Sequence, residues 1–311
     1  MLTIFLAVAG KVAVILVLIA AGYVVSRIGM LTQKGLGEIT SFLVHVVTPC
    51  LIVNSFLTAE KGWLDPVGVL LAVLLPAAAM GICIAISYLF FKKEPPERRK
   101  VLRFALIFSN AGFMGIPLIE SILGSLGVLY GSFFVAVFNL ICWTYGYVMM
   151  GGGRIQVKSL LLNPGIIGLA ISLPIYFLEI PLPDIVVSPV EMVAALNTPL
   201  AMMVVGGYIA RVEPREFISD LSVYKMAALR LIVAPALYLI LLLVLRPNAD
   251  LFLSSLIQAS APVAANCVLF AVEYGGDAKL ASKSVAVTTV LSIITIPLFT
   301  VLTAAYAMGG H

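Results

Sequence analysis

The chain has 311 residues, of which 62% are hydrophobic and 11% are charged. Soluble domains are closer to half apolar and a quarter charged, so this composition excludes an ordinary soluble protein. A membrane-spanning helix needs roughly 20 mostly apolar residues, which leaves room for about ten such helices and for no large soluble domain. The net charge of +4 therefore describes the loops of a membrane protein and gives no reason to expect nucleic acid binding.

Apolar runs separated by charged or turn-rich breaks predict ten transmembrane helices in an all-α polytopic membrane protein. We expect them at residues 4–25, 36–57, 67–91, 101–123, 127–149, 163–181, 190–210, 222–245, 251–273 and 281–305. The first run is too long for the hydrophobic region of a signal peptide, so it is counted as the first span.

Basic residues test this count, because cytoplasmic loops of membrane proteins are enriched in Lys and Arg. Sixteen of the 19 basic residues fall in or beside odd-numbered loops, namely Arg27, Lys34, Lys92, Lys93, Arg98, Arg99, Lys100, Arg103, Arg154, Lys158, Arg211, Arg215, Lys225, Arg230, Lys279 and Lys283. This bias predicts cytoplasmic odd loops and two extracytoplasmic termini in a plasma membrane, expected to be a bacterial inner membrane. We interpret the basic cluster at residues 92–103 as a topology or lipid-headgroup signal.

Four prolines indicate an internal repeat. Pro49 and Pro199 lie in Thr-Pro pairs of the second and seventh spans, while Pro117 and Pro262 interrupt the fourth and ninth. The members of each pair are five spans apart, so the second half of the chain enters the membrane in the opposite direction. The sequence thus predicts two inverted five-helix repeats, residues 1–150 and 160–311, an arrangement typical of secondary transporters.

The segment around Pro117 is the first candidate site. A proline removes a backbone donor and disturbs the preceding turn, and Gly112 and Gly115 leave helical geometry at little cost. Ser109 and Asn110 add polar side chains at the same depth. Backbone groups freed inside a membrane must be satisfied by protein, water or a ligand, which favours a substrate site. Tight packing through small residues is the alternative, but it would need neither the proline nor the asparagine.

Its counterpart in the second half contains Gln258, Pro262 and Asn266. Two spans that break at the same depth in opposite directions would cross near Pro117 and Pro262, with two half-helix N-termini at one cavity. Their partial positive charge favours a carboxylate or another anion. No protein cation is needed in this scheme, and we expect none nearby.

Three ionisable residues within the predicted spans, Glu120, His45 and Lys11, are considered as functional candidates. Glu120 follows Pro117 by about one turn, and a charge facing lipid there would cost about 2.5–3.5 kcal/mol. It is therefore either an inward-facing proton-coupling site or a carboxylate that reaches the outer interface. His45 can titrate near neutral pH, with a hydrogen-bonded packing role as the favoured alternative. Lys11 is expected to extend to the outer surface.

Other patterns argue against an enzyme. Cys50, Cys83, Cys142 and Cys267 lie far apart in apolar runs without a CxxC spacing, so they predict neither a disulfide framework nor a metal site. The sequence has no P-loop, no HExxH motif and no potassium-filter motif. We therefore expect no enzymatic activity, no cofactor and no metal.

Four segments together resemble the auxin efflux carrier family. They are SNAGFMGIPLIESILG at 109–124, LNPGIIGLAISLP at 162–174, LNTPLAMMVVGGYIA at 196–210 and APVAANCVLFAVEYGGD at 261–277. That family contains plant auxin exporters and bacterial permeases assigned to malonate or malate. The resemblance extends over essentially the whole chain, although the central connection at 151–159 is short where many plant members have a long hydrophilic loop.

The resemblance implies the ten-helix fold of the bile acid:sodium symporters. It implies a scaffold part at about 1–57 and 163–210, a transport part at about 67–149 and 222–305, and a homodimer formed through the scaffold. The substrate site would lie at the helix crossing, which maps to Pro117 and Pro262. The residues after Pro262 are Val-Ala-Ala-Asn rather than the glutamate and glutamine pattern of sodium-coupled relatives, so a proton is favoured over sodium as coupling ion.

The leading hypothesis is a secondary carrier that moves small organic anions, such as dicarboxylates or auxin-like carboxylates, by alternating access of the elevator type. Its partners would be the anion, membrane lipids and a coupling ion. Three alternatives stay open: a sodium-coupled organic anion symporter of the bile acid type, a channel, and a membrane sensor that binds a ligand without moving it.

Overall fold

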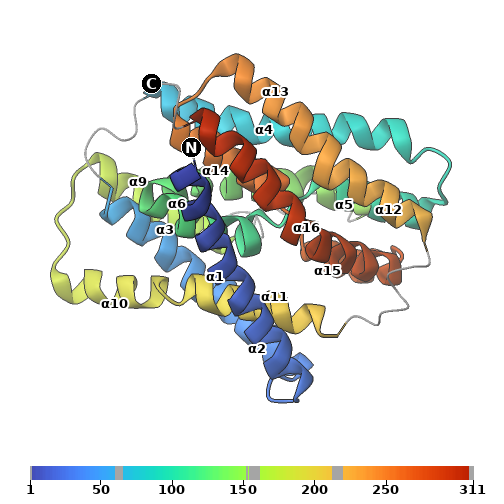
Figure 1. Ribbon diagram of the computed structural model, residues 1–311, viewed down its shortest axis with the longest axis horizontal. Helices are drawn as coiled ribbons and strands as arrows, with labels where there is room; N and C mark the ends of the chain where they lie inside the picture. Colours follow the sequence, from blue (N-terminus) through green and yellow to red (C-terminus); the bar gives the residue numbers. More distant parts are fainter. Residues whose placement is uncertain (1, 60–65, 152, 154–161, 212–219, 308–311) are drawn as a thin grey trace.

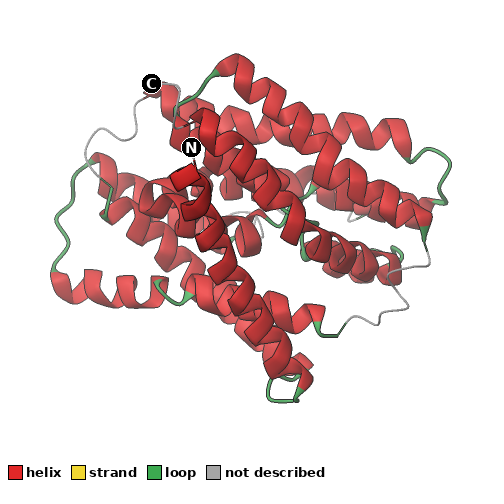
Figure 2. Cartoon of the chain, viewed as in Figure 1, coloured by secondary structure: helices red, strands yellow, loops and turns green. Residues whose placement is uncertain are grey.

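The structure is a computed structural model that describes residues 2–59, 66–151, 153, 162–211 and 220–307. Every regular element within these ranges is a helix, and the β-type pairing that they contain is a single isolated bridge (Figure 2). The predicted all-helical class is therefore confirmed. Three of the basic residues used to predict the topology, Arg154, Lys158 and Arg215, lie outside the described ranges, as does most of the predicted central connection.

The helices follow the predicted spans in order (Figure 1). The α-helices are α1 Leu2–Arg27, α2 Gln33–Phe42, α3 Thr48–Leu57, α4 Pro66–Phe90, α5 Pro96–Ile107, α6 Ile116–Ile141, α7 Tyr147–Met150, α9 Pro164–Phe177, α10 Asp184–Ala194, α11 Asn197–Ile209, α12 Leu221–Ala228, α13 Ala234–Leu245, α14 Ala249–Ser260, α15 Asn266–Glu273 and α16 Ala278–Ala307. The described π-helical turns are η1 Leu43–Val47, η2 Ala111–Gly115, η3 Cys142–Gly146 and η5 Leu229–Val233.

Several helical segments are suited to cross a membrane. Among the described residues, six are long and apolar enough: Gln33–Leu57, Pro66–Phe90, Ala111–Met150, Asp184–Ile209, Leu221–Leu245 and Ala278–Thr300. Ala13–Arg27 and Pro164–Phe177 are shorter apolar helices. These lengths support a multi-pass membrane protein, whereas the count of ten spans and the inverted repeat stay predictions.

The segment Ala111–Met150 covers parts of two predicted spans. Its 40 residues are about twice the length that one span needs. The segment turns at Gly124, whose φ of 65° and ψ of −152° lie in a region that is essentially reserved for glycine. Because Gly124 follows the predicted end of the fourth span at 123, this turn separates that span from the next one.

Three of the π-helical turns end shortly before a proline. η1, η2 and η5 end two residues before Pro49, Pro117 and Pro235, and each proline is the second residue of the following α-helix. A proline has no N–H and its ring clashes with the carbonyl four residues earlier, and a wider π turn relieves both problems. At η1 the Thr48 hydroxyl donates to the carbonyl of Leu43 at 2.9 Å. The helices therefore continue through these prolines.

Helices from both halves of the sequence pack together. α1 packs along α11, and α3 packs against α9 and α10, while α14 lies against α6 and α16. α6 also contacts α3, α9 and α11, so it links these groups. The larger buried apolar cluster includes Phe104, Phe108, Phe134 and Phe270 and surrounds the region where α5 and α14 end. The division into scaffold and transport parts stays a prediction.

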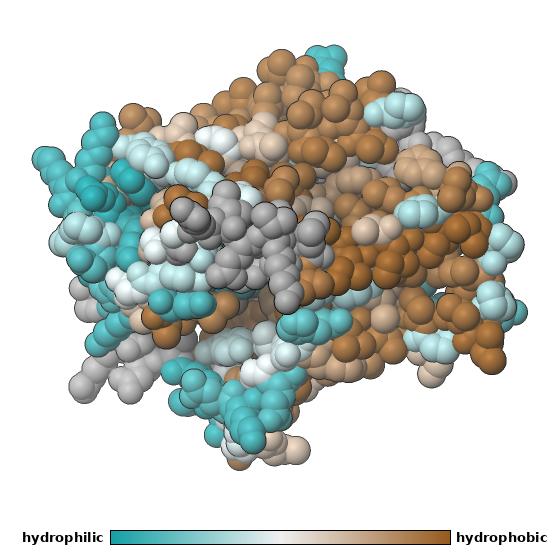
Figure 3. All heavy atoms as spheres, turned by 180° about the vertical axis from the view of Figure 1, so that it is seen from behind, coloured by the Kyte–Doolittle hydropathy of each residue, from teal (hydrophilic) through white to brown (hydrophobic). Residues whose placement is uncertain are grey.

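Hydrophilic residues gather at one end of the molecule, and apolar residues cover much of the face beside it (Figure 3). That end contains the α4–α5 connection and the first turn of α5, where Arg98 pairs with Glu94 at 3.3 Å, Asp220 at 2.8 Å and Asp277 at 3.4 Å. Burial of the Asp220 carboxylate acts to raise its pKa, but the hydrogen bond and charge of Arg98 outweigh this effect and hold the pKa below its usual value. The ion pairs join three connections that are far apart in the sequence.

Candidate functional site

Two helices are interrupted at the candidate site. α5 ends at Ile107, and Phe108 has extended backbone angles, φ −100° and ψ 110°, before η2 begins at Ala111. α14 ends at Ser260, and α15 begins at Asn266. Each interruption produces one helix C-terminus and one helix N-terminus, whose last carbonyls and first N–H groups have no partner within their own helix.

The two interruptions bind each other. Ser109 and Val263 form an isolated antiparallel bridge, in which the Asn110 N–H donates to the Pro262 carbonyl at 2.7 Å and the Ala264 N–H donates to the Phe108 carbonyl at 2.9 Å. The Val263 N–H donates to the Thr288 hydroxyl of α16 at 3.1 Å. Backbone groups that lose their helical partners are thus satisfied by the other broken helix and by α16, as the membrane interior requires.

The crossing lies elsewhere than predicted in the first half of the chain. Pro262 is in the second interruption, and Ala261 before it is extended, because a proline disfavours the α conformation of the preceding residue. Pro117 instead lies in the first turn of α6, after the π turn η2, while the chain breaks at residues 108–110. The prediction that the helices cross at Pro117 is therefore wrong, and the contact is between Ser109 and Val263.

One side of the crossing is comparatively open. Asn110 is buried, with 9% of the residue exposed, and its side-chain oxygen caps η2 by accepting from the Phe113 N–H at 3.2 Å. A Cβ built on Gly112 would have no atom within 4 Å. Asn266, the first residue of α15, is half-buried, and its neighbour Ala265 is exposed. Open space is thus found beside Gly112, near the start of η2, and at Ala265 before α15, while Asn110 itself is buried.

Two other predicted residues are packed tightly against each other. Gln258 is fully buried, and its Nε2 donates to the Gly131 carbonyl at 3.0 Å and more weakly to the Ala111 carbonyl at 3.5 Å. A Cβ on Gly115 would lie 2.8 Å from the Cγ of Gln258. The close approach explains the need for glycine at position 115, and it gives Gln258 and Gly115 a packing role at this site.

A buried arginine lies at the crossing. Arg230, in η5, is 2% exposed. Its guanidinium donates to the Ala259 carbonyl at 2.6 Å, the Leu106 carbonyl at 3.0 Å and the Ala261 carbonyl at 3.1 Å. The expectation of a crossing without a nearby protein cation is therefore wrong, and Arg230, counted among the residues in or beside an odd-numbered loop, is buried at the crossing instead. The sequence did contain a sign of this burial, because Arg230 lies inside the predicted span at 222–245.

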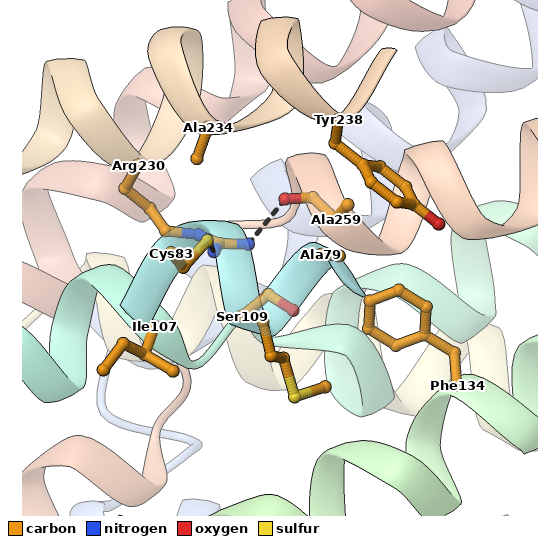
Figure 4. A pocket seen from close by; sticks show the side chains of 10 residues that line it. Ala79, Cys83, Ile107, Ser109, Phe134, Arg230, Ala234, Tyr238 and Ala259 are labelled. Carbon is orange, nitrogen blue, oxygen red and sulfur yellow. Dashed lines mark hydrogen bonds between the residues drawn. The ribbon is translucent and has the colours of Figure 1, made fainter. Parts of the chain in front are cut away.

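A small cavity lies beside Arg230 (Figure 4). Its volume of about 10 Å³ is enough for about one water molecule and too small for a dicarboxylate. Ser109, Cys83 and Tyr238 are among the residues that line it. Ser109, one of the predicted substrate-binding residues, is therefore buried at the closed side of the crossing. Gly112, by contrast, lies beside open space.

The predicted ionisable residues have different surroundings. The Glu120 carboxylate, on α6, accepts a hydrogen bond of 2.6 Å from the Thr198 hydroxyl on α11. The His45 side chain, in η1, is exposed and lies 2.9 Å from the carbonyl of Ser41. The side chain of Lys11 is outside the part of the structure that is described. The described residues contain no cluster of His, Cys, Asp or Glu that could hold a metal ion.

Comparison with known proteins complements this geometry. The chain matches the family described as "Membrane transport protein" over residues 7–159 and 153–300. An uncharacterized transporter of Methanothermobacter thermautotrophicus is 25% identical over 298 residues, which cover 92% of this chain and 95% of that protein. An uncharacterized transporter of Methanocaldococcus jannaschii is 24% identical over 303 residues, covering 93% and 96%. The chain therefore belongs to the membrane transport protein family, the auxin efflux carrier-type family of transporters that its sequence resembles.

Proposed function

We propose that the protein is a secondary carrier that moves small organic anions, such as dicarboxylates or auxin-like carboxylates, across the plasma membrane. The anion binds at the crossing, near Asn110, Gly112 and Asn266. Transport proceeds by alternating access of the elevator type, in which the helices around the crossing move relative to α1, α3, α9 and α11. The coupling ion, if the carrier uses one, is a proton rather than sodium.

The observation that supports this proposal is the pair of interrupted helices that bond to each other. Interrupted helices at membrane depth are the usual substrate sites of secondary transporters, because their half-helix ends present unpaired backbone groups and partial charges. Here η2 begins directly after Asn110, and α15 begins at Asn266. Helix N-termini carry partial positive charge, and amide groups donate hydrogen bonds, so a carboxylate is the ligand that suits them.

The direct test is uptake by proteoliposomes of labelled malonate, malate and indole-3-acetate, each offered separately. We expect saturable uptake of at least one of these anions and competition by its unlabelled form. Flux that does not saturate would indicate a channel, and binding without uptake would indicate a sensor. Dependence on a sodium gradient would favour the sodium-coupled alternative. An absence of both binding and uptake for all three anions would contradict the proposed substrate class.

A variant tests the position of the site. Asn110→Ser keeps a side-chain oxygen that can cap η2 but removes the amide donor, so the helix start should survive while the anion loses a hydrogen bond. We expect the affinity to fall by up to about tenfold, since a neutral hydrogen bond contributes roughly 0.5–1.5 kcal/mol. Ser121→Ala, which removes a hydroxyl bonded within α6, is the matched control. Unchanged affinity in Asn110→Ser would move the site away from the crossing.

A further inference from the structure

We propose that Arg230 is a built-in counter-cation of the crossing, which holds the C-terminal ends of α5 and α14 in place so that the crossing needs no bound metal cation. Arg230 is then a positioning residue for transport. This inference rests on the proposed function in that the crossing serves transport, but it can be tested without a known substrate.

The geometry of Arg230 points to this role. Its three main-chain acceptors belong to two helix ends that are about 150 residues apart in the sequence: Leu106 is in the last turn of α5, and Ala259 and Ala261 are at the end of α14. Carbonyls of the last helical turn have no partner within their helix. One planar guanidinium therefore satisfies carbonyls of both ends at once (Figure 4 shows the contact with Ala259).

The charges of the two helix ends also support the role of Arg230 as their counter-cation. A helix C-terminus carries roughly half a negative elementary charge, so the two ends together offset about one positive charge. Among the described residues, no carboxylate pairs with Arg230; its other side-chain neighbour is the Cys83 sulfur, 3.5 Å from Nη1. A buried charge without such compensation would be very costly. The guanidinium and the two helix ends thus form a nearly neutral group.

Helix C-termini and loose carbonyls are also the groups that coordinate sodium or protons in transporters with interrupted helices. In this protein the guanidinium of Arg230 already donates hydrogen bonds to the carbonyls at the ends of α5 and α14. Because an arginine in a protein does not lose its proton, its charge is present at every physiological pH. The crossing should therefore keep its shape when sodium is absent.

Thermal unfolding of the purified full-length protein in detergent tests the proposal. Arg230→Ala opens a space at the helix ends, and methylguanidinium should fill it, restoring at least half of the loss in the unfolding midpoint. Methylurea has a similar shape without the charge and should restore much less. The wild-type midpoint should not change when sodium is replaced by choline. Arg246→Ala, at the exposed end of α13, is the control and should respond to methylguanidinium as the wild type does.

Two further variants keep the test decisive if Arg230→Ala does not fold. Arg230→Lys retains the charge, whereas Arg230→Gln retains hydrogen-bond donors without it, so the lysine variant should be the more stable of the two. Equal midpoints for these variants, equal rescue by methylurea and methylguanidinium, or a wild-type midpoint that depends on sodium would each overturn the proposal. These measurements need no substrate, so they decide the role of Arg230 independently of whether malonate is transported.

Discussion

Gly112 and Gly115 lie three residues apart in η2, yet a side chain at each position would meet different surroundings. At Gly112 a Cβ would have no atom within 4 Å, whereas at Gly115 it would lie 2.8 Å from the Cγ of Gln258. Gln258 is itself fully buried and bonded to the Gly131 carbonyl. At the scale of single residues, the first glycine thus leaves space for a ligand and the second permits two chain segments to pack.

We expect Gly112→Ala to leave the fold intact and to weaken binding of the transported anion, by up to about tenfold, because the added methyl group occupies the open side of the crossing. Gly115→Ala should instead lower the stability by about 1–3 kcal/mol, the usual cost of overpacking. Thermal unfolding and the KM of uptake, measured on both variants, separate the two effects. Normal affinity in a stable Gly112→Ala protein would argue that the anion binds elsewhere.

At the scale of elements, the contact between α6 and α11 joins helices that the proposed mechanism requires to move relative to each other. Glu120 and Thr198 form a hydrogen bond of 2.6 Å across this contact. A hydrogen bond is worth roughly 0.5–1.5 kcal/mol, and about 1.5–3 kcal/mol when one partner is charged, so it favours the present arrangement of the helices over another. Thr198, of the Thr-Pro pair in the seventh predicted span, therefore serves to connect α11 to α6.

Thr198→Val should remove the bond while keeping the side-chain shape, and Thr198→Ser should preserve it. We expect Thr198→Val to lower the stability by about 1–2 kcal/mol in denaturant titrations, with a much smaller effect in a Glu120→Ala background, where the acceptor is already absent. Additive effects of the two substitutions would show that the residues do not interact in solution. If uptake depends on pH in the wild type and not in Glu120→Gln, Glu120 is the proton-coupling residue.

At the scale of the whole molecule, the start of α1 and the end of α16 lie on the same side (Figure 1), as an even number of membrane crossings requires. The basic residues predict that this side is extracytoplasmic. Leaving Arg230 out of the basic residues counted in or beside the odd-numbered loops does not alter that prediction, because fifteen of those residues remain. The ion pairs of Arg98 with Glu94, Asp220 and Asp277 would then lie on the cytoplasmic side.

Cysteine labelling in a cysteine-free background tests this orientation. A cysteine at position 97, at the start of α5, should react with a membrane-impermeant maleimide only after the cells are opened. A cysteine at position 180, between α9 and α10, should react in intact cells because it is expected on the outer side. The reverse pattern would invert the topology and place both termini in the cytoplasm.

The amino-acid sequence alone determined the membrane class, the order of the helices and the family. These properties depend on local hydropathy and on motifs such as that at residues 109–117, which need no knowledge of distant contacts. It also identified Ser109, Asn110 and Pro262 as residues at the interrupted helices, because asparagine and proline disturb a helix wherever it packs.

Only the tertiary structure decided which residues meet. Local chemistry suggests a break at Pro117, but the π turn η2 accommodates that proline and the interruption lies upstream. The bridge between Ser109 and Val263 depends on the relative positions of two helices that are about 150 residues apart, and local patterns do not specify these positions. The sequence counts Arg230 only as a basic residue near a loop, because the carbonyls that compensate its charge come from the distant ends of α5 and α14.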